Sequence, residues 1–356
     1  MRQHPADHAG LRTRVEDALA AFLAGRLSQL EAIDPALLPL ARAVETLVLG
    51  PGKRLRPAFG YWGYRGAGGV DRDEVVAALA SLEFVQASAL IHDDVIDSSD
   101  TRRGEPAVHR RFERLHRDAG WSGKADTFGA SAAILAGDLC MVWSDDMLHT
   151  SGLDANALAR ARHDFDAMRT EVTVGQYLDV LAQATADTSI ERAGKVALFK
   201  SAKYTVERPL LIGAALAGAG EPLRAAYRRY GRAVGEAFQL RDDILGVFGD
   251  PAETGKPAGD DLREGKRTYL VATAFALADP RQARVLTEDL GDRLLDSARV
   301  DRLREIITGT GALARTEDRI AGLGAEALDA LDAVDLAGGA GEVLADLAAA
   351  SIQRHR

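Results

Sequence analysis

Several residue types are scarce in this sequence of 356 residues, and each shortage excludes a class of protein. A single cysteine, Cys140, cannot form an internal disulfide, and no His/Cys spacing indicates a zinc site. Aromatic residues make up only 6%, and the runs of Val, Ile, Thr and aromatic residues that build a sheet are missing. The longest stretch of small apolar residues, 210–220, is far shorter than the roughly 20 residues of a membrane-spanning helix.

An excess of basic charge is missing as well. The formal net charge is −9, whereas nucleic-acid-binding proteins usually present a basic face. A hydrophobic content of 47% excludes a disordered chain and is enough for a large core. Residues 1–11 are polar and show no signal peptide, so we expect a cytoplasmic protein without an integral membrane segment.

Apolar residues recur at helical spacing along almost the whole chain, as in Val15, Leu19 and Leu23. No Ser-rich or Pro-rich linker divides the sequence, and glycine-containing breaks fall at fairly even intervals. We therefore expect an all-α fold, a single large bundle of about ten or more helices. This bundle would form one domain spanning residues 1–356.

The chain carries two clusters of aspartates on otherwise apolar helices. Asp93, Asp94 and Asp97 end one such helix, where spacings of three and four residues bring the carboxylates to one side. Asp242 and Asp243 belong to a second apolar helix. Either cluster alone would also fit a solvated helix end, but like charges on two apolar helices need compensating cations. Because carboxylate oxygens are ligands that Mg²⁺ prefers, the pair predicts magnesium sites.

Basic residues gather in five short patches that would suit a phosphorylated substrate. Arginine contacts phosphate oxygens in a bidentate manner, and lysine acts as a point charge. The patches are 52–57, Arg102 with Arg103, Lys200 with Lys203, Lys256, and Lys266 with Arg267. Neither a P-loop nor a GxGxxG pattern occurs, so a nucleotide-binding fold is not expected. His92, beside Asp93, is expected to form hydrogen bonds near the metals rather than to bind one.

These motifs occur in an order along the chain that resembles that of the trans-isoprenyl diphosphate synthases of the polyprenyl synthetase family. That family includes bacterial geranylgeranyl diphosphate synthases. The matching residues run from about 45 to about 275. They are Gly52-Lys53-Arg54-Leu55-Arg56-Pro57, Asp93 to Asp97 with Arg102-Arg103-Gly104, Ala136-Gly137-Asp138, Lys200-Ser201, Phe238 to Asp243, and Lys256 to Lys266. Three positions depart from the family pattern, and one of them is Gln86, where many members carry histidine. Ser201 replaces a threonine, and Gly246 stands where a third aspartate is common, so Asp260 or Asp261 would complete that metal site.

The resemblance implies mostly antiparallel helices around a central cavity, usually in a homodimer. Residues 1–40 would form an N-terminal helix or tail, and residues 276–356 would form C-terminal helices. The implied reaction condenses isopentenyl diphosphate with a dimethylallyl, geranyl or farnesyl diphosphate by ionisation, condensation and elimination. Mg²⁺ would be required, with three ions per active site, and Mn²⁺ is an alternative.

The resemblance also implies roles for individual residues. Mg²⁺ would be bound by Asp93, Asp94, Asp97, Asp242 and Asp243. The allylic diphosphate would contact Arg102, Lys200, Lys256 and Lys266, and isopentenyl diphosphate would contact Lys53, Arg54, Arg56, Gln86 and Arg103. The Ser201 carbonyl and the Gln239 side chain would stabilise the allylic cation, and the released diphosphate would take the final proton.

The growing apolar tail is expected to run along the helix that carries Asp93. Its wall would consist of Ser88 and Ala89, with Val85 and Phe84 one turn deeper. Short-chain family members often carry an aromatic residue at the level of Ser88 and Ala89, where this chain has small residues. The barrier would then lie deeper, at Phe84, Met141 or Trp143, which are also ordinary candidates for the core.

The expected product is therefore geranylgeranyl diphosphate, with farnesyl and longer polyprenyl diphosphates as alternatives. Replacing Ser88 with Phe should shorten it. A class I terpene cyclase is disfavoured, because its Asn-Asp…Ser/Thr…Glu triad is missing around Asp242-Asp243. That class would also have no use for Lys53 and Arg56 as a second diphosphate site.

Overall fold

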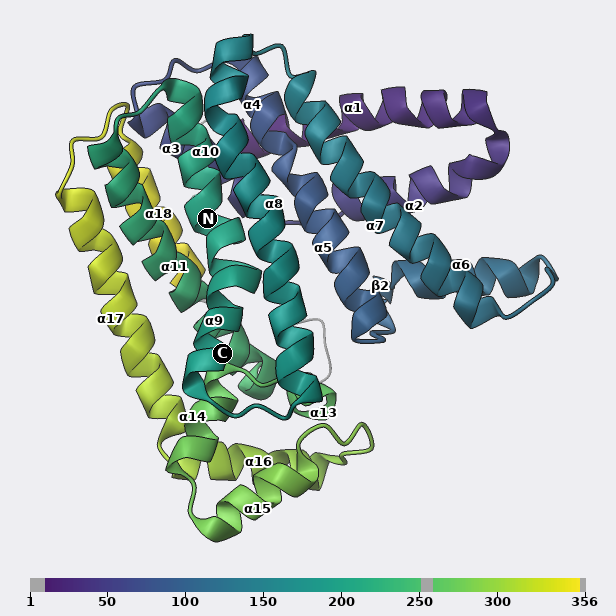
Figure 1. The fold of residues 1–356 in the computed structure, drawn as a ribbon, viewed down its shortest axis with the longest axis vertical. Coiled ribbons are helices and arrows are strands. Elements are labelled where there is room, and N and C mark those ends of the chain that lie inside the picture. Colours follow the sequence, from purple (N-terminus) through teal and green to yellow (C-terminus); the bar gives the residue numbers. More distant parts are fainter. Residues whose placement is uncertain (1–9, 251–258, 353–356) are drawn as a thin grey trace. The chain divides into compact units, whose positions relative to one another are not determined.

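The structure, a computed structural model, describes residues 10–250 and 259–352 and is built almost entirely of helices (Figure 1). Within those ranges the only strands are β1 (Thr101–Arg102) and β2 (Glu105–Pro106), which pair antiparallel in a two-residue ribbon. The predicted all-α fold is confirmed.

The chain divides into two compact units, which are described separately. The first unit contains residues up to 163 together with 209–219 and 337–343. The second unit contains residues 164–208, 220–336 and those from 344 onward.

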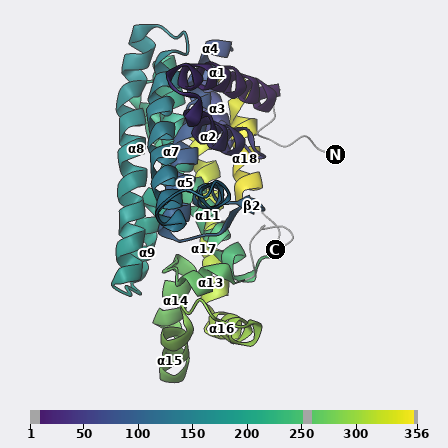
Figure 2. The ribbon, with the colours of Figure 1, turned by 90° about the vertical axis from the view of Figure 1, so that its right-hand side faces the viewer.

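The first unit contains the N-terminal helices and a long helical hairpin. Its elements are α1 (Leu11–Ile33), η2 (Pro35–Leu37), α2 (Leu38–Leu49), α3 (Leu55–Gly66), α4 (Asp73–Ala80), α5 (Leu82–Ile96), β1, β2, α6 (Val108–Asp118), α7 (Ala125–His149), the start of α8 (Ala155–Ala184), most of α10 (Arg208–Ala217) and the start of α18 (Ala340–Ile352). The α1 helix packs against α2 and α4, and α7 packs against both α5 and α6 (Figures 1 and 2).

Glycines allow α3 and α10 to cross at close range within the first unit. A Cβ atom on Gly63 would lie 2.7 Å from the Leu210 carbonyl oxygen. A Cβ atom on Gly213 would overlap the carbonyl oxygen of Gly60. Because glycine has no side chain, the two backbones can meet directly here.

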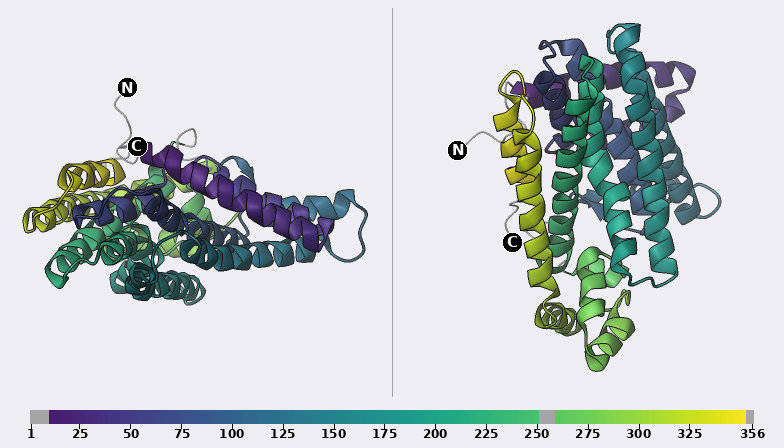
Figure 3. Two further views of the ribbon diagram at one scale, coloured as in Figure 1. Left: turned by 90° about the horizontal axis from the view of Figure 1, so that it is seen from above. Right: turned by 60° about the vertical axis from the view of Figure 1, so that its left-hand side comes forward.

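The second unit is built around the long helix α11. Its elements are the remainder of α8, α9 (Ile190–Val196), the π-helix η3 (Ala197–Glu207), α11 (Glu221–Phe248), α13 (Asp260–Glu264), α14 (Tyr269–Leu277), α15 (Pro280–Asp289), α16 (Ser297–Gly309), α17 (Ala312–Asp332) and the remainder of α18. The α11 helix packs along α17 and η3 (Figure 3). Tyr230 of α11 is fully buried. In this part of the described chain, residues 280–352 are mostly helical.

Candidate active site

The first aspartate motif forms the C-terminal turn of α5. Asp94 is 2% exposed and accepts a hydrogen bond from Arg102 Nε at 3.0 Å, while Asp93 is 3.7 Å from the same guanidinium group. The backbone N–H of Asp97 donates to the Asp93 carbonyl and caps the helix. The motif therefore pairs its carboxylates with a neighbouring arginine.

The ribbon after α5 is what brings Arg102 back to this motif. Arg103 and Gly104 both have positive φ angles, 55° and 81°, which is the conformation of a tight hairpin turn. Arg102 lies on β1, before this turn, and pairs with Asp94, eight residues earlier. The sequence Arg102-Arg103-Gly104 thus combines a charge with the turn that positions it.

Buried arginines form a basic cluster in the same unit. Arg54 and Arg56 are 4% and 7% exposed, and Arg54 donates to Glu83 at 2.8 Å. Burial lowers the pKa of Arg103, and the positive charges of Arg54, Arg102 and Arg56 lower it further. Several guanidinium groups gathered around one carboxylate leave the cluster with a positive potential, which favours an anion.

Gly52 lies against this cluster, and Lys53 and Gln86 belong to the same unit. A Cβ atom on Gly52 would lie 3.5 Å from Arg54 Nη1 and 3.8 Å from Arg103 Nη1, so both groups approach this backbone. The side chain of Lys53 is exposed and that of Gln86 is half-buried. The structure therefore brings together Arg54, Arg56, Arg102 and Arg103 among the predicted substrate residues.

His92 is held between α5 and α7. Its Nε2 atom lies 3.1 Å from the Ile134 carbonyl oxygen and 3.5 Å from Asp138 Oδ1. A Cβ atom on Gly137 would lie 2.2 Å from His92 Nε2, so the glycine leaves room for the imidazole ring in this position. His92 thus has polar partners on α7, and Gly137 and Asp138 of the Ala136-Gly137-Asp138 motif both lie against its ring.

The second aspartate motif lies on α11, in the second unit. Asp243 is 3% exposed and accepts a hydrogen bond from Gln239 Nε2 at 2.7 Å. Burial raises the pKa of Asp243 to about 7, and the charges of Asp261 and Asp242 act in the same direction. A bound cation would relieve this repulsion, so the motif suits a metal ion.

Gly246 provides room for another carboxylate beside this motif. A Cβ atom at this position would overlap Asp261 Oδ2, so the Asp261 side chain fills the space where a residue-246 side chain would begin. Lys266 Nζ lies 3.5 Å from Asp261 and 2.7 Å from Glu264. Of the two candidates for the third carboxylate, Asp261 is the one whose side chain meets Gly246.

Lys200 and Ser201 belong to the π-helix η3. Lys200 donates to Asp179 of α8 at 2.6 Å, and a side chain at Gly175 would overlap the Lys200 backbone. Irregular π-helical turns often mark functional sites. Asp179 and Gly175 were not predicted as site residues, although their spacing of four residues on one helix was visible in the sequence.

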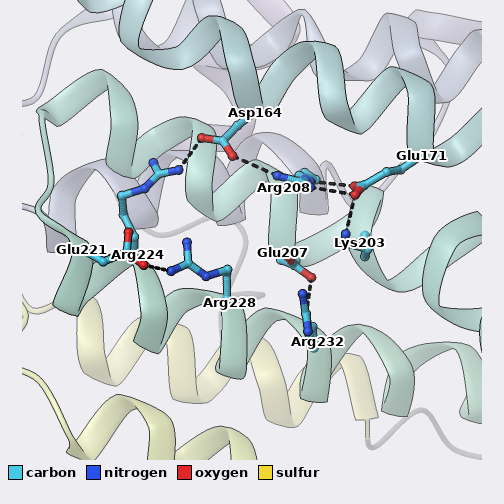
Figure 4. A network of polar contacts seen from close by, with 9 residues as sticks. All are labelled: Asp164, Glu171, Lys203, Glu207, Arg208, Glu221, Arg224, Arg228 and Arg232. Atoms are coloured by element: carbon cyan, nitrogen blue, oxygen red, sulfur yellow. Dashed lines mark hydrogen bonds and ion pairs between the residues drawn. The ribbon is translucent and has the colours of Figure 1, made fainter.

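Ion pairs connect η3 with α8 and α11 (Figure 4). Lys203 pairs with Glu171, and Arg208 binds both Glu171 at 2.7 Å and Asp164 at 3.0 Å. Arg232 of α11 lies 3.0 Å from Glu207. Lys203 was expected beside Lys200 in a substrate-binding patch, but it is 6% exposed and has a structural partner.

The residues of α5 that were predicted to line the tail path are mostly buried. Phe84, Val85 and Ser88 are each 0% exposed, whereas Ala89 is half-buried. The Ser88 hydroxyl is buried without a hydrogen-bond partner, so only packing holds it. Lys256, predicted to bind the allylic diphosphate, lies outside the described residues.

The carboxylates suit a metal that also binds other oxygens. Across residues 10–250 and 259–352, no three His, Cys, Asp or Glu side chains are arranged to hold an ion by themselves. Mg²⁺ usually takes one or two carboxylates and completes its shell with water and phosphate oxygens. The aspartates therefore fit a divalent metal that is bound together with a diphosphate.

An all-α fold with two helical aspartate motifs and a buried arginine cluster is the arrangement that the sequence predicted for a prenyltransferase. The family model for polyprenyl synthetases matches residues 39–307. The chain is 32% identical over 277 residues to geranylfarnesyl diphosphate synthase of Aeropyrum pernix, covering 77% of this chain and 80% of that protein. It is 31% identical over 263 residues to geranylgeranyl diphosphate synthase of Saccharolobus solfataricus, covering 72% of each.

Solved structures agree with the sequence comparison. The geranylgeranyl pyrophosphate synthase of Corynebacterium glutamicum, in complex with isoprenyl diphosphate and magnesium, matches with a TM-score of 0.94 and 44% identity. That match covers 97% of this chain and 99% of the other. The chain belongs to the polyprenyl synthetase family and is a trans-prenyltransferase.

Two segments of the described chain, 73–96 and 125–149, are long and apolar enough to cross a membrane. The apolar windows in these segments are 72% and 28% buried in the fold, respectively. Core helices pass the same test, so the result is weak support for a membrane span.

Proposed function

We propose that the enzyme makes geranylgeranyl diphosphate from isopentenyl diphosphate and an allylic diphosphate. The main support for this product is a sequence identity of 44%, over nearly the full length of both chains, to a geranylgeranyl pyrophosphate synthase. The small residues Ser88 and Ala89 support this product, because an aromatic side chain at that level would stop a shorter tail. Farnesyl and longer diphosphates are the alternative products.

Five aspartates, Asp93, Asp94, Asp97, Asp242 and Asp243, would hold Mg²⁺. Three ions per active site are proposed, and Mn²⁺ is a possible replacement. Bound metal would stabilise negative charge on the departing diphosphate. Asp261, beside Gly246, adds a carboxylate to the second motif and supports its use there.

The allylic diphosphate would be bound by Arg102, Lys200, Lys256 and Lys266. Three of these cations have acidic partners in the structure: Asp94 for Arg102, Asp179 for Lys200 and Glu264 for Lys266. Such partners keep each cation oriented. Charge-assisted hydrogen bonds to the diphosphate would then form with little side-chain reorganisation.

Isopentenyl diphosphate would bind at the arginine cluster of the first unit. It would contact Arg56, Arg103, Lys53 and Gln86. Arg54, which is anchored to Glu83, would add its charge. The anion would offset the burial and the neighbouring positive charges that together lower the pKa of Arg103. This arrangement would supply the second diphosphate site that the condensation requires.

The allylic cation would form when the C–O bond to the diphosphate breaks. The Ser201 carbonyl and the Gln239 side chain would stabilise it, and the π-helix at 197–207 supports a carbonyl role because its hydrogen bonding is irregular. The double bond of isopentenyl diphosphate attacks the cation. The released diphosphate then takes a proton from the adjacent carbon.

We further propose that the chain acts as a single catalytic domain over residues 1–356. The reaction needs both aspartate motifs, so the catalytic domain would have to include the whole motif-bearing part of the chain. A cytoplasmic homodimer is proposed as the working form.

Incubation with isopentenyl diphosphate, Mg²⁺ and each allylic primer in turn, followed by mass analysis of the product, tests this function. We expect elongation that ends at geranylgeranyl diphosphate. Asp242→Asn should slow turnover by at least 100-fold, because it removes a metal-binding charge, whereas Asp118→Asn on the exposed end of α6 should not. No elongation with any primer would exclude the proposal, and hydrocarbon products would indicate a cyclase.

A further inference from the structure

The helix α1 lies outside every family motif, yet it is firmly attached to the first unit (Figure 3, left, purple). Its residues Leu11, Val15, Leu19 and Leu23 are each at most 1% exposed. Arg14 also binds Asp71, just before α4, at 2.9 Å and Asp73, the first residue of α4, at 2.6 Å. A helix fixed in this way can present a side chain at a defined position.

Phe22 of α1 completes an aromatic cluster with α5 and α7. Its ring centroid lies 5.4 Å from that of Phe84 and 6.5 Å from that of Trp143, and the last two are 6.1 Å apart. All three pairs have edge-to-face geometry, which is favourable for aromatic rings. The cluster therefore joins a residue of no known motif to two of the expected tail barriers.

Arg26 covers the Phe22 ring. Its guanidinium carbon lies 4.7 Å from the ring centroid, within the range of a cation–π contact. The same guanidinium group binds Asp146 of α7 at 2.6 Å. This ion pair links α1 to α7 and orients Arg26 over the ring.

The depth of the cluster matches three isoprene units. Phe84 lies nine residues before Asp93, which at 1.5 Å per residue is about 13 Å along α5. Each isoprene unit adds four chain carbons, roughly 4.5 Å with bonds near 1.5 Å. A farnesyl tail would reach the rings, and a geranylgeranyl tail would collide with them.

Burial distinguishes Phe22 from its two partners. Phe84 is 0% exposed and Trp143 is 4% exposed, whereas Phe22 is half-buried. Of the three rings, Phe22 is therefore the one that borders solvent, and its two partners lie on the interior side of it.

We propose that Phe22 closes the far end of the tail path and that Arg26 positions it. Phe22, together with Phe84 and Trp143, limits the allylic substrate to three isoprene units, so that the four-unit product is not elongated again. This inference rests on the proposed synthase activity and deepens it. It assigns α1 a role in product length.

The test compares farnesyl and geranylgeranyl diphosphate as primers for the full-length enzyme. Wild-type enzyme should elongate only the first. Phe22→Ala should elongate both, raising the kcat/KM ratio of the longer to the shorter primer by at least tenfold and yielding geranylfarnesyl diphosphate. Arg26→Met should give a smaller shift in the same direction. Phe128→Ala, which removes a ring from a separate aromatic cluster on α7, is the matched control and should leave the ratio unchanged.

The inference fails if Phe22→Ala keeps the wild-type ratio. It also fails if Phe84→Ala lengthens the product and Phe22→Ala does not. If Phe22→Ala does not fold, the same kcat/KM ratio is measured for Phe22→Leu, and an unchanged ratio again contradicts the inference. A wild-type product other than geranylgeranyl diphosphate would overturn the proposed product, whereas the change caused by Phe22→Ala would still test the role of α1.

Discussion

At the scale of single residues, the contact between Gly246 and Asp261 sets the composition of the second metal motif. Gly246→Ala would place a methyl group where the Asp261 carboxylate lies. Because the obstructed atoms are the end of a side chain, Asp261 would turn away and the fold would be kept. We expect the enzyme to bind Mg²⁺ about tenfold more weakly. The Mg²⁺ concentration that gives half-maximal activity should therefore rise about tenfold.

Gly322→Ala is the matched control for this variant. It makes the same substitution on a helix, at a site where no atom lies within 4 Å. If both variants show the same Mg²⁺ dependence, Asp261 does not contribute to the metal site.

The residues of the candidate site differ in how far the sequence predicts them. The spacing of Asp93 and Asp97 is local, so helical geometry places them on one side without knowledge of the fold. Partners such as Asp179 and Glu83 lie 21 and 29 residues from the cations they bind. Their pairing depends on how helices pack, which spacing along the chain does not reveal.

At the scale of elements, the ion pairs of Figure 4 hold the π-helix that carries Lys200 and Ser201. Burial alone would raise the pKa of Glu171, but hydrogen bonds from Arg208 and Lys203 outweigh it and lower that pKa. A lowered carboxyl pKa stabilises the fold above the unfolded value near 4.5, and this stability is lost as the pH falls through the folded pKa.

Glu171→Gln should therefore lower the free energy of unfolding by about 2 kcal/mol at neutral pH. The difference from wild type should shrink once the pH falls below about 4. Urea unfolding of both proteins at a series of pH values measures this. Glu191→Gln, which alters an exposed ion pair on α9, is the control and should change little. A difference independent of pH would contradict the role given to the Glu171 charge.

The crossing of α3 and α10 gives a second prediction at this scale. Gly213→Ala would force the two backbones apart, because its Cβ atom would overlap the Gly60 carbonyl. We expect a loss of about 1–3 kcal/mol in stability, measured by thermal unfolding. Gly25→Ala, where nothing lies within 4 Å, should not destabilise. Equal stability of the two variants would show that the crossing can relax.

Elements were more predictable from the sequence than their local irregularities. Apolar periodicity is repeated over many turns, so the helices and the lack of an extended sheet in the described residues followed from it. The π-helix at 197–207 and the ribbon at 101–106 did not. Both depend on a few residues, and the π-helix is held by ion pairs to α8 and α11.

At the scale of the whole molecule, the net charge of −9 does not oppose an anionic substrate. Carboxylates of both aspartate motifs contribute to that charge, and bound metal would offset them. The arginine cluster around Glu83 supplies local positive potential. Substrate attraction therefore depends on local groups rather than on the total charge, and should weaken as ionic strength rises.

The proposed homodimer has a candidate surface on α7. Leu135 and Val142 are 59% and 63% exposed, and seven residues, or two turns, separate them on one side of the helix. Apolar side chains exposed together in this way are typical of an interface. Since α7 also carries Trp143 and Asp146, a second copy seated on this face would support the helix that completes the proposed tail barrier.

Replacing Leu135 and Val142 with Glu should therefore convert the dimer into monomers, because charged residues would have to be buried in the interface. Light scattering after size-exclusion chromatography should show the molar mass falling by half. Leu294→Glu is the control, since that residue is 88% exposed and belongs to the second unit. A double variant that stays dimeric would place the interface elsewhere. A monomeric wild-type protein would exclude the dimer itself, and the exposed apolar residues of α7 would then need another partner.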